Sequence, residues 1–337
     1  MTLAAIWFIL VFVLLGGYAI LDGFDLGVGA LHLFARGEHE RRVAMNAIGP
    51  VWDGNEVWLL TAGGALFAAF PPVYAAVFSG FYIALMLVLA CLMFRAVSME
   101  FRGKVNSARW RRAWDVAFGG SSTLLPILFG VALGNVLRGV PLEVDGTYDG
   151  TFLGLLNPYA ILVGVLTLVA LTMHGAAFLA FKSDGKMHER SRRAAVGLWV
   201  VFVVLFVTTS VATAVAAPSL LRGSSSPIAW AALAMLAIAM FGFPMALRRR
   251  RLSVAVLASG AIIAAMMALA AIGLFPRLLP SSTDPSASLT IYNSSSSHRT
   301  LLAMLVIALI GMPLVIGYTT LIYRAFAGKV VLTEDSY

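Results

Sequence analysis

Two pairs of acidic residues stand inside stretches of sequence that are otherwise apolar. Asp22 and Asp25 lie in the first apolar run, and Asp53 and Glu56 lie at the start of the second. The spacing within each pair is three residues, so the two carboxyl groups share one face of a helix. Acids inside a membrane-embedded helix are costly and are most often functional, so these pairs predict a site that carries protons.

Polar and aromatic residues accompany these acids. Trp52, Asn55 and Trp58 surround the second pair, and Arg95 ends the third apolar run. For these residues a purely structural role is an alternative to the functional one. Tryptophans are common anchors at a membrane surface, and an acid in the first turn of a helix, as we expect for Asp53, is stabilised by the helix dipole.

The bulk composition identifies the class of protein. Of the 337 residues, 60% are hydrophobic and 12% are charged, and the mean hydropathy is +0.91. Soluble domains carry about 25% charged residues. The net charge of +8 is spread over short loops between apolar runs, which argues against nucleic-acid binding. A single cysteine, Cys91, excludes an internal disulfide and a CxxC zinc pair.

Nine apolar runs have the length of a membrane span, which is about 20 residues. The sequence therefore predicts an all-α polytopic integral membrane protein with nine transmembrane helices. The first run lacks the basic start of a signal peptide, so we expect it to be retained. The predicted spans are Leu3–Phe34, Val51–Phe70, Val73–Phe94, Ala113–Leu137, Tyr159–Phe181, Ala194–Ala217, Ile228–Leu247, Leu252–Phe275 and Leu301–Phe326.

The basic residues predict the orientation of the chain. Alternate connections hold 20 of the 24 lysines and arginines, which marks their side as cytoplasmic. The N-terminus is then outside and the C-terminus inside, and residues 280–297 form an irregular outer loop. At a rise of about 1.5 Å per residue, both acid pairs lie near the cytoplasmic face. There, Asp22 has a possible partner in Arg36, Arg41 or Arg95.

The other ionisable groups point less clearly to chemistry. We expect Asp115 in the first turn of its helix, where the dipole explains it. His32 shares a helix face with Asp25, and His174 alone lies well inside a span. A haem ligand usually has a second axial partner on another helix, and no HxxxH or HExxH spacing marks a metal site. No nucleotide-binding or hydrolase motif is present.

Two glycine patterns predict close contacts between helices. Gly23 and Gly27, and Gly130 and Gly134, are separated by four positions, as in small-xxx-small contacts. The alternative is that glycine is simply frequent in membrane helices. The halves of the chain differ, because the later spans lack the polar residues of the first four. A transporter built from inverted repeats shows matching polar breaks in both halves, so this pattern disfavours a transporter.

The chain resembles subunit II of the cytochrome bd-type quinol oxidases along its whole length. The resemblance rests on four stretches and on the outer loop from Pro280 to Thr290. The stretches are DGFDLGVG at 22–29, WDGNEVW at 52–58 with its continuation to Pro71, the segment from Tyr74 to Arg95, and GNVLRGVP at 134–141.

The resemblance implies a fold and a setting. The fold is a single membrane domain with one four-helix bundle over residues 1–137, a second over 159–275 and a ninth helix over 298–326. The chain is expected to pair with haem-bearing subunit I, which holds haems b and d, in a bacterial inner membrane. This chain then binds no metal and no catalytic cofactor. Small accessory subunits, membrane lipid and a structural quinone are further expected partners, and the short outer loops favour the cyanide-insensitive branch.

The resemblance also implies roles for single residues. Asp25 and Asp53 match positions proposed to carry protons towards the haems, with Trp52 and Arg95 beside them. It favours Asp25 over Asp22 and Asp53 over Glu56 as carriers. Two rival hypotheses remain: a scaffold that only supports the haem subunit, and a proton-coupled transporter that acts alone.

Overall fold

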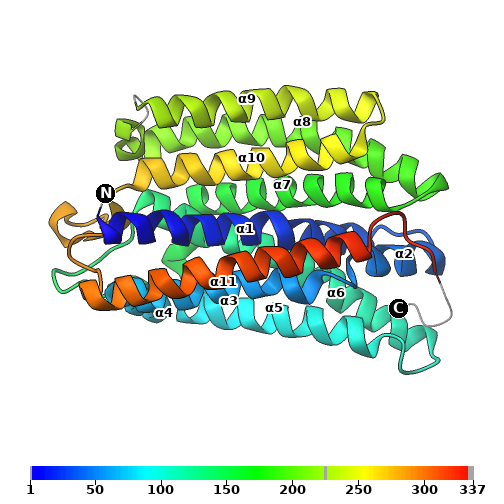
Figure 1. The fold of residues 1–337 in the computed structure, drawn as a ribbon, viewed down its shortest axis with the longest axis horizontal. Coiled ribbons are helices and arrows are strands. Elements are labelled where there is room, and N and C mark those ends of the chain that lie inside the picture. The colour runs from blue at the N-terminus through cyan, green and yellow to red at the C-terminus, as the bar shows by residue number, and fades with distance from the viewer. Residues whose placement is uncertain (1, 224–225, 333–337) are drawn as a thin grey trace.

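The fold was derived from a computed structural model, which describes residues 2–223 and 226–332. Within them the chain is almost entirely helical (Figure 1). The α-helices are α1 (Leu3–His32), α2 (Glu38–Ile48), α3 (Trp52–Ala69), α4 (Pro71–Gly80), α5 (Tyr82–Phe101), α6 (Ala108–Arg138), α7 (Pro158–Lys182), α8 (Gly185–Ala216), α9 (Pro227–Arg248), α10 (Leu252–Leu274) and α11 (His298–Ala325). Three short 3-10 helices accompany them: η1 (Leu153–Leu155), η2 (Pro218–Gly223) and η3 (Pro285–Ala287).

Local sequence explains where most of the long helices begin. The side chains of Thr2, Ser107, Asn157, Ser226 and Ser297 each accept a hydrogen bond from a backbone N–H three residues ahead. Such caps satisfy donors that the first turn of a helix leaves free. Prolines in the first turns of α7 and α9 strengthen these starts. Proline lacks a backbone N–H, and an N–H at that position has no partner within the helix.

Eight helices in the described part of the chain are long and apolar enough to cross a membrane. They are α1, α5, α6, α7, α8, α9, α10 and α11. The 18-residue α3 falls outside this group, since Asp53, Asn55 and Glu56 make its first turns polar. The expected all-α membrane architecture is confirmed, and the count of nine spans stays a prediction.

The structure corrects two local expectations. The predicted span Val73–Phe94 is wrong as one helix, because α4 ends at Gly80 and α5 begins at Tyr82. Gly80 packs against the ring of Tyr148, so a side chain there has no room. The loop after α10 is not fully irregular, since β1 (Arg277–Leu279) pairs antiparallel with β2 (Leu289–Thr290).

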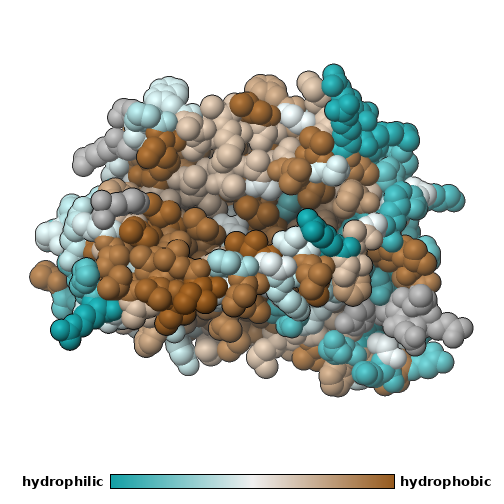
Figure 2. All heavy atoms as spheres, in the orientation of Figure 1, coloured by the Kyte–Doolittle hydropathy of each residue, from teal (hydrophilic) through white to brown (hydrophobic). Residues whose placement is uncertain are grey.

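A short amphipathic helix, α2, follows the first span and was not predicted from the sequence. Its buried residues include Val43, Ala44, Ala47 and Ile48, the spacing of one helix face. With 11 residues it is too short to cross a membrane. It lies at the arginine-rich end of the molecule, which we define by α2, the α5–α6, α7–α8 and α9–α10 turns and the end of α11. Figure 2 shows hydrophilic residues at this end beside a broad hydrophobic flank.

The helices assemble around α1, which packs against α3, α6, α7 and α10 (Figure 1). Glycine permits the closest of these approaches. A Cβ on Gly27 would overlap the carbonyl oxygen of Leu171 and lie 2.9 Å from the Cα of Gly175. A Cβ on Gly130 would lie 2.6 Å from the Cα of Gly164. The predicted close contacts at both glycine patterns are therefore confirmed.

We predict that Gly27→Ala destabilises the protein, because the new methyl group meets α7 backbone that cannot move aside. The expected cost is about 1–3 kcal/mol, the usual range for overpacking. Thermal unfolding of the purified protein in detergent measures it. Gly197→Ala is the matched control, since no atom lies within 4 Å of a Cβ there. Equal unfolding temperatures for the two variants would contradict the prediction.

Candidate functional site

A buried ion pair joins α1 to α5. Arg95 donates from Nη2 to Asp22 Oδ1 at 2.6 Å and from Nη1 to Asp22 Oδ2 at 3.0 Å. Both side chains have no solvent-exposed surface. A two-pronged contact of this kind is among the strongest that a carboxylate and a guanidinium make. Of the three partners that the sequence offered Asp22, the structure selects Arg95.

Two further carboxyl groups surround the same guanidinium. Glu56 on α3 accepts from Arg95 Nη1 at 2.7 Å, and Asp25 Oδ2 lies 4.0 Å from Arg95 Nη2. Three carboxyl groups from α1 and α3 thus share one arginine from α5. We call Asp22, Asp25, Glu56 and Arg95 the carboxylate cluster.

Asn55 connects the cluster to two other parts of the chain. Its Nδ2 donates to Asp25 Oδ2 at 2.7 Å and to the carbonyl oxygen of Leu21 at 3.1 Å. Its Oδ1 accepts from the hydroxyl of Tyr323 on α11 at 3.0 Å. Asp25 is fully buried, and its Oδ1 makes no hydrogen bond within the described chain. One oxygen of Asp25 is therefore held, and the other is unpaired.

The remaining predicted residues of this stretch lie around the cluster. Asp53 is in the first turn of α3, as expected, and its side chain is exposed. Trp52 packs against an apolar cluster to which α1, α2 and α7 contribute, and Trp58 lies against Gly17 of α1. The two indoles thus take part in helix packing. The structure brings Asp22, Asp25, Asn55, Glu56 and Arg95 together but leaves Asp53 outside the cluster.

A second polar cluster lies at the arginine-rich end. Asp115 on α6 accepts from Arg102 Nε at 2.6 Å and lies 2.7 Å from His32 Nε2, with Arg41 at 3.4 Å. Arg102 also holds Glu38 through two hydrogen bonds, which lower the pKa of the Glu38 carboxyl below its usual range. Because α6 begins at Ala108, Asp115 is not in its first turn. The helix-dipole explanation for Asp115 is therefore wrong, and ion pairing replaces it.

His174 has both ring nitrogens engaged. Nε2 donates to the carbonyl oxygen of Ile20 at 3.0 Å, so a neutral ring accepts at Nδ1 from the hydroxyl of Ser259, 2.7 Å away. The ring thus joins α7 to α1 and α10. This arrangement does not fit an axial haem ligand, which needs a free nitrogen. Within the described residues no group of three His, Cys, Asp or Glu side chains is arranged to hold a metal ion.

Tyr323 was not predicted from the sequence. Its hydroxyl reaches Asn55 across 268 positions of sequence, and its ring lies edge-on to Phe24 of α1. The weak available signal was a tyrosine close to Arg324, at the cytoplasmic end of a predicted span. Its spacing alone gave no reason to place it beside α3.

We predict that Arg95→Leu prevents stable folding, because it leaves the buried carboxyl groups of Asp22 and Asp25, and the partly exposed Glu56, without their cation. Breaking a buried pair on one side costs about 3–5 kcal/mol. Yield from membranes and unfolding temperature measure the loss. Arg249→Leu is the control, since Arg249 is exposed in the α9–α10 turn. Normal yield and stability of Arg95→Leu would show that the cluster does not depend on this charge.

Comparison with known proteins places this chain in a family. Residues 3–326 match the family described as cytochrome bd terminal oxidase subunit II. Cytochrome bd-I ubiquinol oxidase subunit 2 of Escherichia coli K12 is 39% identical, over 96% of this chain and 94% of that protein. Cytochrome bd ubiquinol oxidase subunit 2 of Bacillus subtilis is 36% identical, over 96% of both chains.

A solved structure shares the fold. The bd oxidase from Geobacillus thermodenitrificans contains a chain that superimposes with a TM-score of 0.80 at 21% identity, over 97% of this chain and 99% of that one. The resemblance expected from the DGFD and WDGNEVW stretches is confirmed. The chain is a multi-pass membrane protein and belongs to the cytochrome bd terminal oxidase subunit II family.

Proposed function

We propose that this subunit of a bd-type oxidase supplies protons from the cytoplasm to a haem-bearing partner through the carboxylate cluster. The observation that carries the proposal is the charge balance of the cluster: two fully buried carboxyl groups and the partly exposed Glu56 share one guanidinium. A buried charge without compensation is costly, and a bound proton removes the excess negative charge. The cluster therefore has the composition of a site that takes up and releases a proton.

The hydrogen bonds favour Asp25 as the carrier. Asp22 is occupied on both oxygens by Arg95, whereas Asp25 keeps one oxygen unpaired. Glu56 is held by Arg95 and is partly exposed. Asp53 is exposed near the arginine-rich end, where it can gather protons but does not hand them directly to Asp25. Trp52, Trp58 and Asn55 then act by holding α3 in place.

The proposal includes a topology. We take α3 as the ninth span. It packs against α1, and the chain returns to the arginine-rich end through α4 and α5. The arginine-rich end is cytoplasmic, so the N-terminus is outside and the C-terminus inside. Helices α1, α3, α5 and α6 form the first bundle (residues 1–137), α7–α10 the second (159–275), and α11 is the further helix. The cluster then lies in the cytoplasmic half of the first bundle.

The partners follow from the family. In the proposed complex, quinol is oxidised and oxygen is reduced to water on the haem-bearing subunit I, which holds haems b and d. This chain contributes no haem ligand, in line with the engaged nitrogens of His174. Binding of a structural quinone and of lipid, the presence of small accessory subunits, and membership of the cyanide-insensitive branch stay predictions.

We predict that Asp25→Asn slows oxygen consumption by the purified complex while haem content stays normal. The amide keeps the shape and the contact with Asn55 but holds no transferable proton. A loss of at least about tenfold is expected, because a positioned group that transfers protons typically contributes about 100-fold or more. Asp53→Asn is expected to have a smaller effect, because Asp53 lies outside the cluster.

The same variant tests the scaffold hypothesis. If this chain only supports its partner, Asp25→Asn lowers haem content or assembly and leaves turnover per haem unchanged. Full turnover with normal haem content would refute the proton role and leave the family assignment intact.

We predict that a tag on this chain co-purifies a second subunit together with haem. A reduced-minus-oxidised absorption spectrum of the sample is expected to show bands of haems b and d. A colourless single-chain sample that transports an ion or solute would refute the oxidase assignment and support the transporter hypothesis.

A further inference from the structure

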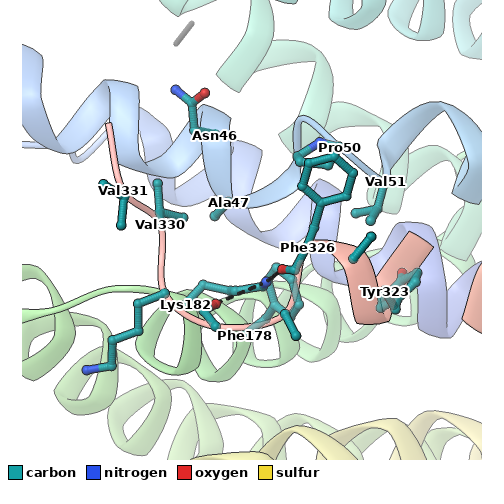
Figure 3. Close-up of a pocket in the computed structure, with 14 residues that line it drawn as sticks. Asn46, Ala47, Pro50, Val51, Phe178, Lys182, Tyr323, Phe326, Val330 and Val331 are labelled. Atoms are coloured by element: carbon teal, nitrogen blue, oxygen red, sulfur yellow. Dashed lines mark hydrogen bonds between the residues drawn. The ribbon is translucent and has the colours of Figure 1, made fainter. Parts of the chain in front are cut away.

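A cavity of about 310 Å³ opens at the arginine-rich end, between α2, α7 and the end of α11. Figure 3 shows its lining: Ala47 and Pro50 come from α2 and the turn after it, Phe178 from α7, and Tyr323 and Phe326 from the end of α11. The cavity is large enough to hold several water molecules. It belongs to neither of the two polar clusters described above.

The segment after α11 closes one side of the cavity. Lys182 Nζ donates to the carbonyl oxygens of Phe326 at 2.6 Å and Gly328 at 3.2 Å, and the backbone N–H of Val330 donates to the Lys182 carbonyl at 2.8 Å. Lys329 forms an ion pair with Asp184. These contacts hold the segment against α7, so the cavity is a built feature of the fold.

The inner wall of the cavity leads to the carboxylate cluster. Val51 lines it, and the backbone N–H of Asn55 bonds to the Val51 carbonyl, one helical turn away. Tyr323 also lines it, and the Tyr323 hydroxyl donates to Asn55 Oδ1. Asn55 in turn donates to Asp25 Oδ2. Two successive hydrogen bonds therefore join a wall residue of the cavity to Asp25.

We propose that this cavity is the cytoplasmic entrance through which water brings protons towards Asp25, and that Tyr323 is the positioning residue that sets Asn55 against Asp25. The inference rests on the proposed proton role of Asp25 and adds the entrance and a residue of α11. It differs from a route through Asp53, which lies on the exposed start of α3.

The direction of the hydrogen bonds explains the role of Tyr323. An amide has one acceptor oxygen and one donor NH₂ group. Because Tyr323 occupies the oxygen of Asn55, the NH₂ group is turned towards Asp25 and the Leu21 carbonyl. Asp25 is thereby held through Oδ2, and its Oδ1 stays available for the proton. Without the Tyr323 hydroxyl, Asn55 is free to turn and Asp25 loses its fixed orientation.

The first test is Tyr323→Phe, which keeps the ring and removes the hydroxyl. Oxygen consumption at saturating quinol is expected to fall about three- to tenfold, the equivalent of one lost hydrogen bond. Haem content and the KM for quinol are expected to stay unchanged, and the solvent deuterium isotope effect on turnover is expected to rise, because proton delivery becomes slower. Tyr318→Phe is the matched control on the same helix, since Tyr318 is 62% exposed.

The second test examines the entrance itself. In a Cys91→Ala background, Ala47→Cys places a thiol in the cavity wall at a position that is only 4% exposed. A cationic methanethiosulfonate reagent is expected to modify it and to block turnover. Lys186→Cys, exposed in the first turn of α8, is expected to react without loss of activity.

The outcomes separate this inference from the proposed function. If Asp25→Asn is slow but Tyr323→Phe has a normal rate and a normal isotope effect, only the role of Tyr323 is overturned. Full activity of the modified Ala47→Cys protein, or no modification at all, would overturn the cavity as the entrance. Normal turnover of Asp25→Asn would instead refute the proton role from which the inference starts.

Discussion

The structure of this subunit depends on one buried guanidinium. Arg95 holds Asp22 through two hydrogen bonds and Glu56 through a third, so α1, α3 and α5 must meet at one depth. Arg95 meets both hydrogen-bond partners only if all three helices are correctly placed, and a buried charge without its partner is costly. Packing meets this demand: Trp58 fills the space beside Gly17 between α3 and α1, and Gly27 lets α7 approach α1 from another side.

The cluster contains both a fixed part and an adjustable part. Asp22 and Arg95 form the fixed part, since neither is exposed and two hydrogen bonds join them. Asp25 forms the adjustable part, because only one of its oxygens is held, by an amide that also contacts α11. A site that only stabilised the fold would gain from pairing every oxygen. An unpaired oxygen beside a fixed ion pair is instead what a group needs if it is to gain and lose a proton without disturbing the helices around it.

The sequence predicted much of this arrangement, because hydropathy and helical spacing are local properties. Apolar runs located the long helices, and the three-residue spacing placed Asp22 and Asp25 on one face. The missed features depend on contacts distant in sequence. Gly80, where α4 ends, packs against the ring of Tyr148 from a loop, and the contact of Tyr323 with Asn55 joins α11 to α3. The exposure of Asp53 could not be predicted from the local sequence either. An acid in the first turn of a helix can lie on a buried or on an exposed face.

The two helices that carry the acids are apolar on the side of the cluster away from the arginine-rich end. There α1 has no polar side chain from Gly17 back to Phe8, and α3 has only Thr61 from Leu59 to its end at Ala69. These ends of the helices pack into an apolar core that includes Trp7, Phe8 and Phe70. Such a core offers a proton no site, because a buried charge there has no partner. On the proposed role of the cluster, α1 and α3 offer a proton no titratable side chain beyond it. The proposed route from the arginine-rich end therefore turns sideways at the cluster, towards a partner, as expected of a subunit that feeds protons to a reaction without pumping them.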